Sequence, residues 1–119
     1  MSTTNLDMQK MRVAASEATA MLRVLANEDR VLLLCQLTRG EACVSELEEQ
    51  LGIRQPTLSQ QLGILRAEKI VSTRRDGRNI FYRICDQRAI AVLATLYGLY
   101  CPASMPAHAP SGKVSGGAP

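Results

Sequence analysis

The chain has 119 residues, of which 46% are hydrophobic, and it carries a formal net charge of +3 at pH 7. These values are typical of one globular domain and exclude a disordered chain. Met1–Lys10 lacks the apolar core of a signal peptide, and the apolar run Ala89–Cys101 is too short to span a bilayer. We therefore expect a cytoplasmic protein with no membrane partner.

The basic residues are concentrated in one segment. Residues 53–84 hold seven basic and two acidic residues, a net charge of +5, whereas the remainder of the chain carries −2. Such a local excess of positive charge is typical of a surface that contacts nucleic-acid phosphates.

The first half of the chain predicts two helices. Residues 1–6 are polar and are expected to form a disordered N-terminus. From about Asp7 to Ala26, apolar residues recur at helical spacing, which predicts the first helix. Asn27 is a favoured N-cap residue, so a second helix is expected to follow it and to run to about Thr38.

The next segment predicts a helix-turn-helix. Ser45 and Glu48 have the spacing of a capping box, so we expect a short third helix that stops at Gly52. Proline is favoured in a first helical turn, and a fourth helix is expected from near Pro56 to about Glu68.

A hairpin and a last helix complete the ordered chain. Val71–Arg75 and Asn79–Ile84 are rich in residues that favour strands, and Asp76 and Gly77 between them predict a tight turn. Asp86 is an expected N-cap for a helix that runs from Gln87 to about Tyr100. The ordered domain is thus expected to span residues 7–101. The tail, residues 102–119, is rich in Pro, Gly, Ser and Ala and is predicted to be disordered.

These elements together predict a mainly α fold, a winged helix-turn-helix of about five helices with a two-stranded β-wing. The last helix is apolar around nearly its whole circumference, so it must be covered on all sides. We expect a homodimer that packs through the first and last helices. The alternative is that the last helix occupies the centre of a monomer.

The fourth helix and the hairpin form a predicted surface for double-stranded DNA. Leu58, Leu62 and Leu65 share one helical face and are expected to pack inward. Small and amide side chains on the other faces suit the major groove, and arginines near the hairpin tip suit phosphates or the minor groove. The candidate DNA-binding residues are Gln55, Thr57, Ser59, Gln60, Gln61, Arg74, Arg75 and Arg78. A solvated helix face beside a charged hairpin is the alternative interpretation.

The runs LANEDRVLLLCQL, VSELEEQLGIRQPTLSQQLGILR and FYRI resemble the ArsR/SmtB family of dimeric winged-helix repressors. The resemblance covers Leu25 to Cys101. It implies a dimer that binds operator DNA and an inducer that releases it.

The metal sites of that family are incomplete in this sequence. Its transition-metal sensors use ligands on the last helix, where Arg88–Tyr100 offers none, and the only histidine is His108 in the tail. Its arsenic and cadmium sensors often carry a Cys-x-Cys pair, of which Cys43 is present but Ser45 stands at the second position. We therefore expect no resident metal and no cofactor.

Cys35 and Cys101 are similarly placed to the two sensing cysteines of the SqrR/BigR subgroup. The resemblance implies a dithiol that reacts with reactive sulfur species or another oxidant and closes as a disulfide or polysulfide bridge, which lowers operator affinity. An arsenite- or soft-metal-responsive repressor that uses Cys43 with Cys35 or Cys101 is the alternative. Buried packing would also explain Cys35, and Cys43 and Cys85 are expected to have no sensing role.

Two functions of other classes remain as outsiders. A thiol enzyme is not expected, because the chain has no Cys-x-x-Cys motif and no histidine in the predicted domain to activate a nucleophile. An interaction module that does not bind DNA is the other.

Overall fold

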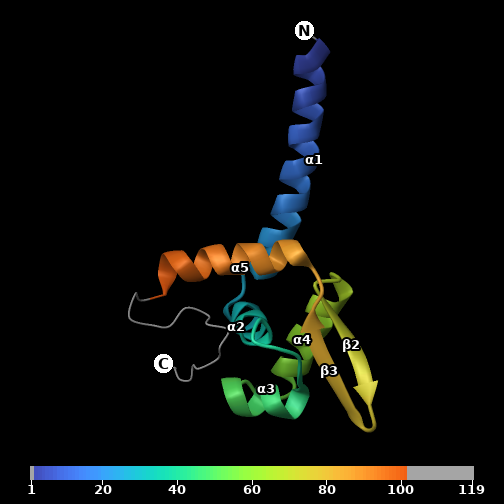
Figure 1. Cartoon of the computed structure of the whole chain (residues 1–119), viewed down its shortest axis with the longest axis vertical. Helices are drawn as coiled ribbons and strands as arrows, with labels where there is room; N and C mark the ends of the chain where they lie inside the picture. The colour runs from blue at the N-terminus through green and yellow to red at the C-terminus, as the bar shows by residue number, and fades with distance from the viewer. Residues whose placement is uncertain (1, 102–119) are drawn as a thin grey trace.

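The computed structural model describes residues 2–101, which form five helices and a three-stranded antiparallel sheet (Figure 1). The elements are α1 (Ser2–Leu25), α2 (Glu28–Leu37), β1 (Ala42–Cys43), α3 (Val44–Leu51), α4 (Thr57–Ala67), β2 (Val71–Asp76), β3 (Asn79–Ile84) and α5 (Gln87–Tyr100). The predicted winged helix-turn-helix is confirmed, and one further strand joins it.

The core lies between α2, α3, α4 and the sheet, below the point where α5 crosses the end of α1 (Figure 1). Its largest fully buried side chains are leucines: Leu33, Leu34, Leu47, Leu58, Leu62 and Leu65. Because the chain has no tryptophan and one phenylalanine, leucine packing replaces aromatic packing in this domain.

Helix α1 begins at Ser2, five residues before the expected start at Asp7, and its helical backbone includes residues 2–6, for which disorder was expected. Polar residues sustain this extension because a helix needs no apolar residue in every turn once later turns have formed. The expected disordered tail, residues 102–119, lies outside the described residues.

The predicted capping box of α3 is wrong. The N-cap is Cys43 rather than Ser45, and Glu46 Oε1 accepts the backbone N–H of Cys43 at 2.9 Å. Strand β1 extends the backbone up to Cys43, so the helix starts one residue before Ser45. The caps of the neighbouring helices agree with prediction, since Asn27 accepts the N–H of Arg30 in α2 and Asp86 accepts that of Arg88 in α5.

The sheet has the strand order β1-β3-β2, so β3 is its centre. β2 and β3 form the predicted hairpin, in which Val71 pairs with Ile84 and Asp76 with Asn79. The turn lies at Gly77 and Arg78, one residue later than expected, and Gly77 has a φ of 67°, which glycine adopts readily. The short β1 pairs with Phe81 and Tyr82 of β3 and ties the wing to the helical body.

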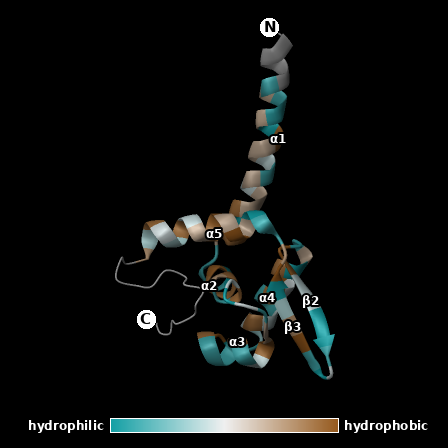
Figure 2. Ribbon diagram, in the orientation of Figure 1, coloured by the Kyte–Doolittle hydropathy of each residue, from teal (hydrophilic) through white to brown (hydrophobic). Residues whose placement is uncertain are grey.

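Figure 2 shows hydrophobic residues along α5 and in α1, and several of their side chains are exposed. On α5 only Ala89 and Leu93 are buried, whereas Leu99 is 71% exposed and Tyr100 80%. On α1, Leu22 is 58% exposed. A single chain therefore does not cover the last helix, in contrast to the alternative in which that helix fills the centre of a monomer.

Between the two helices lies an open, mainly apolar groove of about 450 Å³, lined by Ala14, Glu17, Ala18, Met21, Leu22, Arg88, Ala91 and Val92. Within residues 2–101, none of the helices has the length and hydropathy that crossing a bilayer requires.

Candidate functional site

Helices α3 and α4 form the helix-turn-helix. Gly52 ends α3 in the left-handed conformation with a φ of 73°, and its N–H donates to Glu48 O. The chain then reverses into α4, whose Leu58, Leu62 and Leu65 are fully buried, as predicted. The inward face of α4 is thus fixed by the core, and Ser59 and Gln60, which lie off that face, are exposed.

The N-terminal turn of α4 uses two candidate side chains in its own structure. Gln55 Oε1 accepts the N–H of Ser59 at 3.2 Å, and the Ser59 hydroxyl donates to Pro56 O at 3.1 Å. Gln55 thereby binds one of the N–H groups that the first helical turn leaves unpaired. Both side chains are exposed, as is Gln60, while Thr57 is half-buried.

Gln61 lies elsewhere. Its side chain is half-buried and its Oε1 accepts a hydrogen bond of 2.8 Å from Nη1 of Arg30 in α2. The structure therefore separates Gln61 from the exposed candidates Ser59 and Gln60, although all three stand in consecutive positions.

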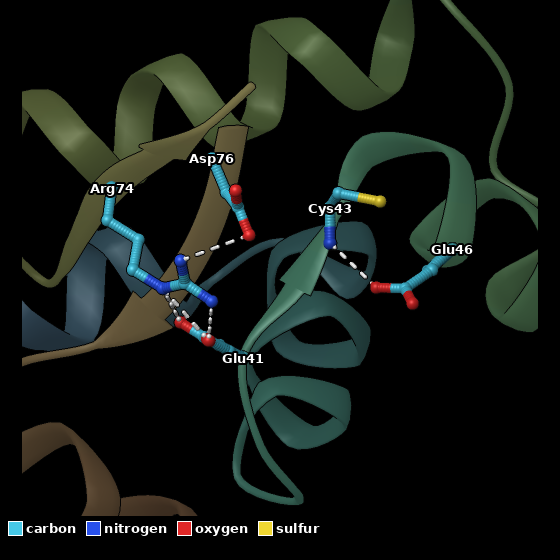
Figure 3. A network of polar contacts seen from close by, with 5 residues as sticks. All are labelled: Glu41, Cys43, Glu46, Arg74 and Asp76. Carbon is cyan, nitrogen blue, oxygen red and sulfur yellow. Dashed lines mark hydrogen bonds and ion pairs between the residues drawn. The ribbon is translucent and has the colours of Figure 1, made fainter. Parts of the chain in front are cut away.

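The three candidate arginines of the wing also differ in their surroundings. Figure 3 shows the Arg74 guanidinium between two carboxylates, and its Nε and Nη2 donate to Glu41 at 2.5–3.0 Å, while Nη1 lies 3.8 Å from Asp76. The guanidinium also lies 4.7 Å from the ring centroid of Phe81, its partner across the hairpin. The hydrogen bonds from Arg74 lower the pKa of Glu41.

Arg75 and Arg78 are exposed near the tip of the wing. Side chains alternate between the faces of a strand, so Arg75 projects from the face opposite to Arg74. Of the three candidate arginines, Arg75 and Arg78 thus have no carboxylate partner among the described ion pairs, whereas Arg74 fastens the wing to the segment before β1.

Cys35 and Cys101 are 66 positions apart in the chain but lie near enough in space for Cys101 to affect the pKa of Cys35. Cys35 lies on α2 against the core, and Cys101 directly follows α5; both are half-buried free thiols. Burial raises the pKa of Cys35, the neighbouring Cys101 raises it further, and Arg39 acts in the opposite direction. Two partly accessible thiols thus lie on α2 and directly after the end of α5.

The other two cysteines differ from this pair. Cys43 is buried, with its Sγ 3.4 Å from the Ser45 hydroxyl. Cys85 is exposed, and its thiol donates to Lys69 O at 3.5 Å. Across residues 2–101, no three His, Cys, Asp or Glu side chains gather to hold a metal ion, so Cys43 does not complete a three-thiol site with Cys35 and Cys101.

Sequence reasoning missed Arg30 and Glu41, which each hold a candidate DNA-binding residue. Both act over more than 30 positions in sequence. Arg30 lies just after the N-cap of α2, where the helix dipole does not favour a basic residue. Its presence there is a weak sign that its side chain binds another part of the protein. Glu41 gave no signal, because the strand that places it beside the wing is only two residues long.

Comparisons with known proteins show the family to which the chain belongs. Residues 27–73 match the family described as bacterial regulatory protein, arsR family. The biofilm growth-associated repressor of Agrobacterium fabrum is 47% identical over 76% of this chain and 78% of its own length. The chain belongs to the ArsR family.

Solved structures extend this similarity to the fold. The repressor BigR from Xylella fastidiosa superposes with a TM-score of 0.75 at 44% identity, over 80% of this chain and 97% of the BigR chain. Reduced HlyU from Vibrio cholerae gives a TM-score of 0.74 at 35% identity, over 79% of this chain and 99% of HlyU.

As a member of the ArsR family, the protein is a DNA-binding transcriptional repressor and not an enzyme.

Proposed function

We propose that this ArsR-family protein is a cytoplasmic homodimer whose binding to operator DNA is controlled by thiol chemistry at Cys35 and Cys101. The observation that supports the proposal is that these two free, half-buried thiols, on α2 and directly after α5, are near enough for one to affect the pKa of the other. The two thiols belong to elements that are far apart in sequence, so a covalent link between them would constrain how those elements lie in the domain.

The dimer is supported by the uncovered apolar surface of α1 and α5. The groove between these helices contains Met21 and Val92, and exposed Leu22 borders it. A second copy that presents the same surface across a two-fold axis would cover it. Because the axis would relate two copies of α4, the operator would be near-palindromic, with half-sites in successive major grooves.

In each half-site, Thr57, Ser59 and Gln60 from the N-terminal half of α4 would face the base edges. Arg75 and Arg78 would contact the sugar-phosphate backbone beside them. Gln55 would orient the first turn of α4 through its bond to Ser59.

The proposed inducer is a persulfide, R–S–SH. One thiolate attacks its terminal sulfur and forms a protein persulfide, and RSH leaves. The second thiolate then attacks Sγ of the first cysteine, which forms the Cys35–Cys101 disulfide and releases the outer sulfur as H₂S. Two thiols are oxidised to the disulfide while R–S–SH is reduced to RSH and H₂S. Each further R–S–SH consumed adds one sulfur to the bridge and releases another RSH.

A bridge of this kind would bind the end of α5 to α2. α5 belongs to the proposed dimer interface and α2 packs against α4, the proposed recognition helix, so the bridge would change the relative position of the two recognition helices of the dimer. Operator binding requires both helices to match the spacing of the grooves, and a small displacement lowers affinity.

Fluorescence anisotropy with labelled operator, combined with mass spectrometry, tests the proposal. A persulfide donor should release the wild-type protein from DNA and yield a Cys35–Cys101 cross-link, with a loss of two hydrogens and, for a polysulfide bridge, an added gain of whole sulfur atoms. Cys35→Ser and Cys101→Ser should remain bound. Cys85→Ser is the matched control and should be released, because Cys85 is exposed but lies away from the pair.

Release of the Cys35→Ser and Cys101→Ser variants by the donor would refute the thiol assignment. A titration with arsenite distinguishes oxidant sensing from soft-metal sensing. Tight, stoichiometric arsenite binding that releases DNA without oxidation of any cysteine would assign the protein to soft-metal sensing instead.

A further inference from the structure

The guanidinium of Arg30 joins three helices. Arg30 stands in the first turn of α2, and its Nε donates to Val24 O in the last turn of α1 at 2.6 Å. Its Nη1 donates to Gln61 Oε1 on α4 at 2.8 Å, and its Nη2 lies 3.5 Å from Arg23 O. One planar group therefore contacts the end of α1 and the middle of the recognition helix.

Both kinds of contact suit arginine. The last carbonyl groups of a helix have no partner within it, and a positive charge is favourable at that end. The fork of the guanidinium supplies several donors in a fixed plane, so it can bridge backbone carbonyls and a side-chain amide at once. A lysine ammonium in the same place has the charge but not the fork.

The contact also fixes the orientation of Gln61. A guanidinium only donates hydrogen bonds, so it is the amide oxygen of Gln61 that faces Arg30. The side chain is half-buried against α2. Gln60, the preceding residue of the same helix, is exposed instead.

We propose that Arg30 is a positioning residue for operator recognition, which holds α4 at a fixed place relative to the end of α1 through Gln61. Gln61 then anchors the recognition helix and does not read a base. Arg30 strengthens operator binding although it contacts no DNA. The proposal rests on the DNA-binding function and not on the chemistry of Cys35 and Cys101, so its tests use the reduced protein without inducer.

Two pairs of variants test the role of Arg30, with affinity measured for operator and for unrelated DNA over a range of salt. Arg30→Leu and Gln61→Leu should each weaken operator binding by about tenfold or more, since each breaks a charge-assisted hydrogen bond. The double variant should be no weaker than the weaker single variant, because both changes remove the same contact. Affinity for unrelated DNA and its salt dependence should not change.

Arg30→Lys separates positioning from charge and is the least disruptive variant for folding. A phosphate contact survives this exchange, whereas the three-way bridge does not, so operator affinity should fall while the salt dependence stays constant. Full retention of operator affinity in Arg30→Lys would overturn the proposal. A fall of about 0.9 per protomer in the slope of log K against log salt for Arg30→Leu would also overturn it, because that is the value for one lost phosphate contact.

Glutamate substitutions test where Gln61 points. Gln61→Glu keeps an oxygen toward Arg30 and pairs with its charge, whereas Gln60→Glu, the matched control, places a negative charge on the exposed face that is proposed to meet the DNA. Gln61→Glu should therefore weaken operator binding much less than Gln60→Glu. Equal losses for the two variants would show that Gln61 faces the DNA, and the anchor role would be wrong.

Discussion

The unequal roles of the three wing arginines lead to a measurable difference in the salt dependence of DNA binding. Arg75 and Arg78 are exposed near the tip, whereas Arg74 is held by Glu41, Asp76 and the ring of Phe81. The perturbation is the replacement of each arginine in turn by alanine.

The expected magnitude follows from the number of phosphate contacts. Each neutralised phosphate contributes about 0.9 to the slope of log K against log salt, so a dimer that loses two contacts loses about 1.8. Between 50 and 200 mM salt this slope corresponds to about twelvefold in affinity. Arg75→Ala and Arg78→Ala should each lose this part of the salt dependence. Arg74→Ala should change the slope little, because its donors already serve Glu41.

The assay is a titration of labelled operator by anisotropy at several salt concentrations. Glu41→Gln is a useful companion, because it weakens the hold on Arg74 and leaves the arginine free to reach a phosphate, so its slope should increase. A slope for Arg74→Ala that falls as far as that of Arg75→Ala would refute the division of roles in the wing.

Three further predictions concern the domain itself. Leu62→Ala should destabilise the fold by about 2–5 kcal/mol, measured by denaturant unfolding at fixed protein concentration, because Leu62 is fully buried; a loss below about 1 kcal/mol would contradict its place in the core. Asp86→Ala should cost about 1 kcal/mol in the same assay, since its carboxylate caps α5 through the N–H of Arg88, and Asp86→Asn should retain most of the stability. In Cys101→Ser, alkylation of Cys35 should accelerate as the pH rises and have its midpoint at a higher pH than that of a free cysteine, because burial disfavours the thiolate and raises its pKa; a midpoint below that of free cysteine would contradict the burial of the thiol.

The sequence predicts the local elements well because their signals are local. The cap residues Asn27 and Asp86, the left-handed Gly52 and the leucine spacing of α4 each act within a few positions, and each was found where expected. The cap of α3 was mispredicted because a cysteine at the end of a strand took the place that Ser45 suits by propensity. Strand β1 was missed because a strand of two residues is too short to be recognised by its periodicity.

The site was predictable as a surface but not residue by residue. Gln60 and Gln61 have the same chemistry and adjacent positions, yet the turn of the helix exposes one and places the other against Arg30. Arg74 and Arg75 are divided in the same way by the alternation of a strand. These distinctions depend on partners more than 30 positions away, and no local pattern carries that information.

Helix α2 is attached to both the recognition helix and the wing, so a small movement of α2 would be enough to regulate this protein. Near its first residue, Arg30 holds the recognition helix, and shortly after its last residue, Glu41 holds the wing. Cys35 lies between these two attachments. A rotation of α2 about its middle would move its two ends in opposite directions and would pull the recognition helix and the wing out of register with each other. DNA must accept both at once, so a tilt that is small at the thiol becomes a mismatch at two places along the duplex.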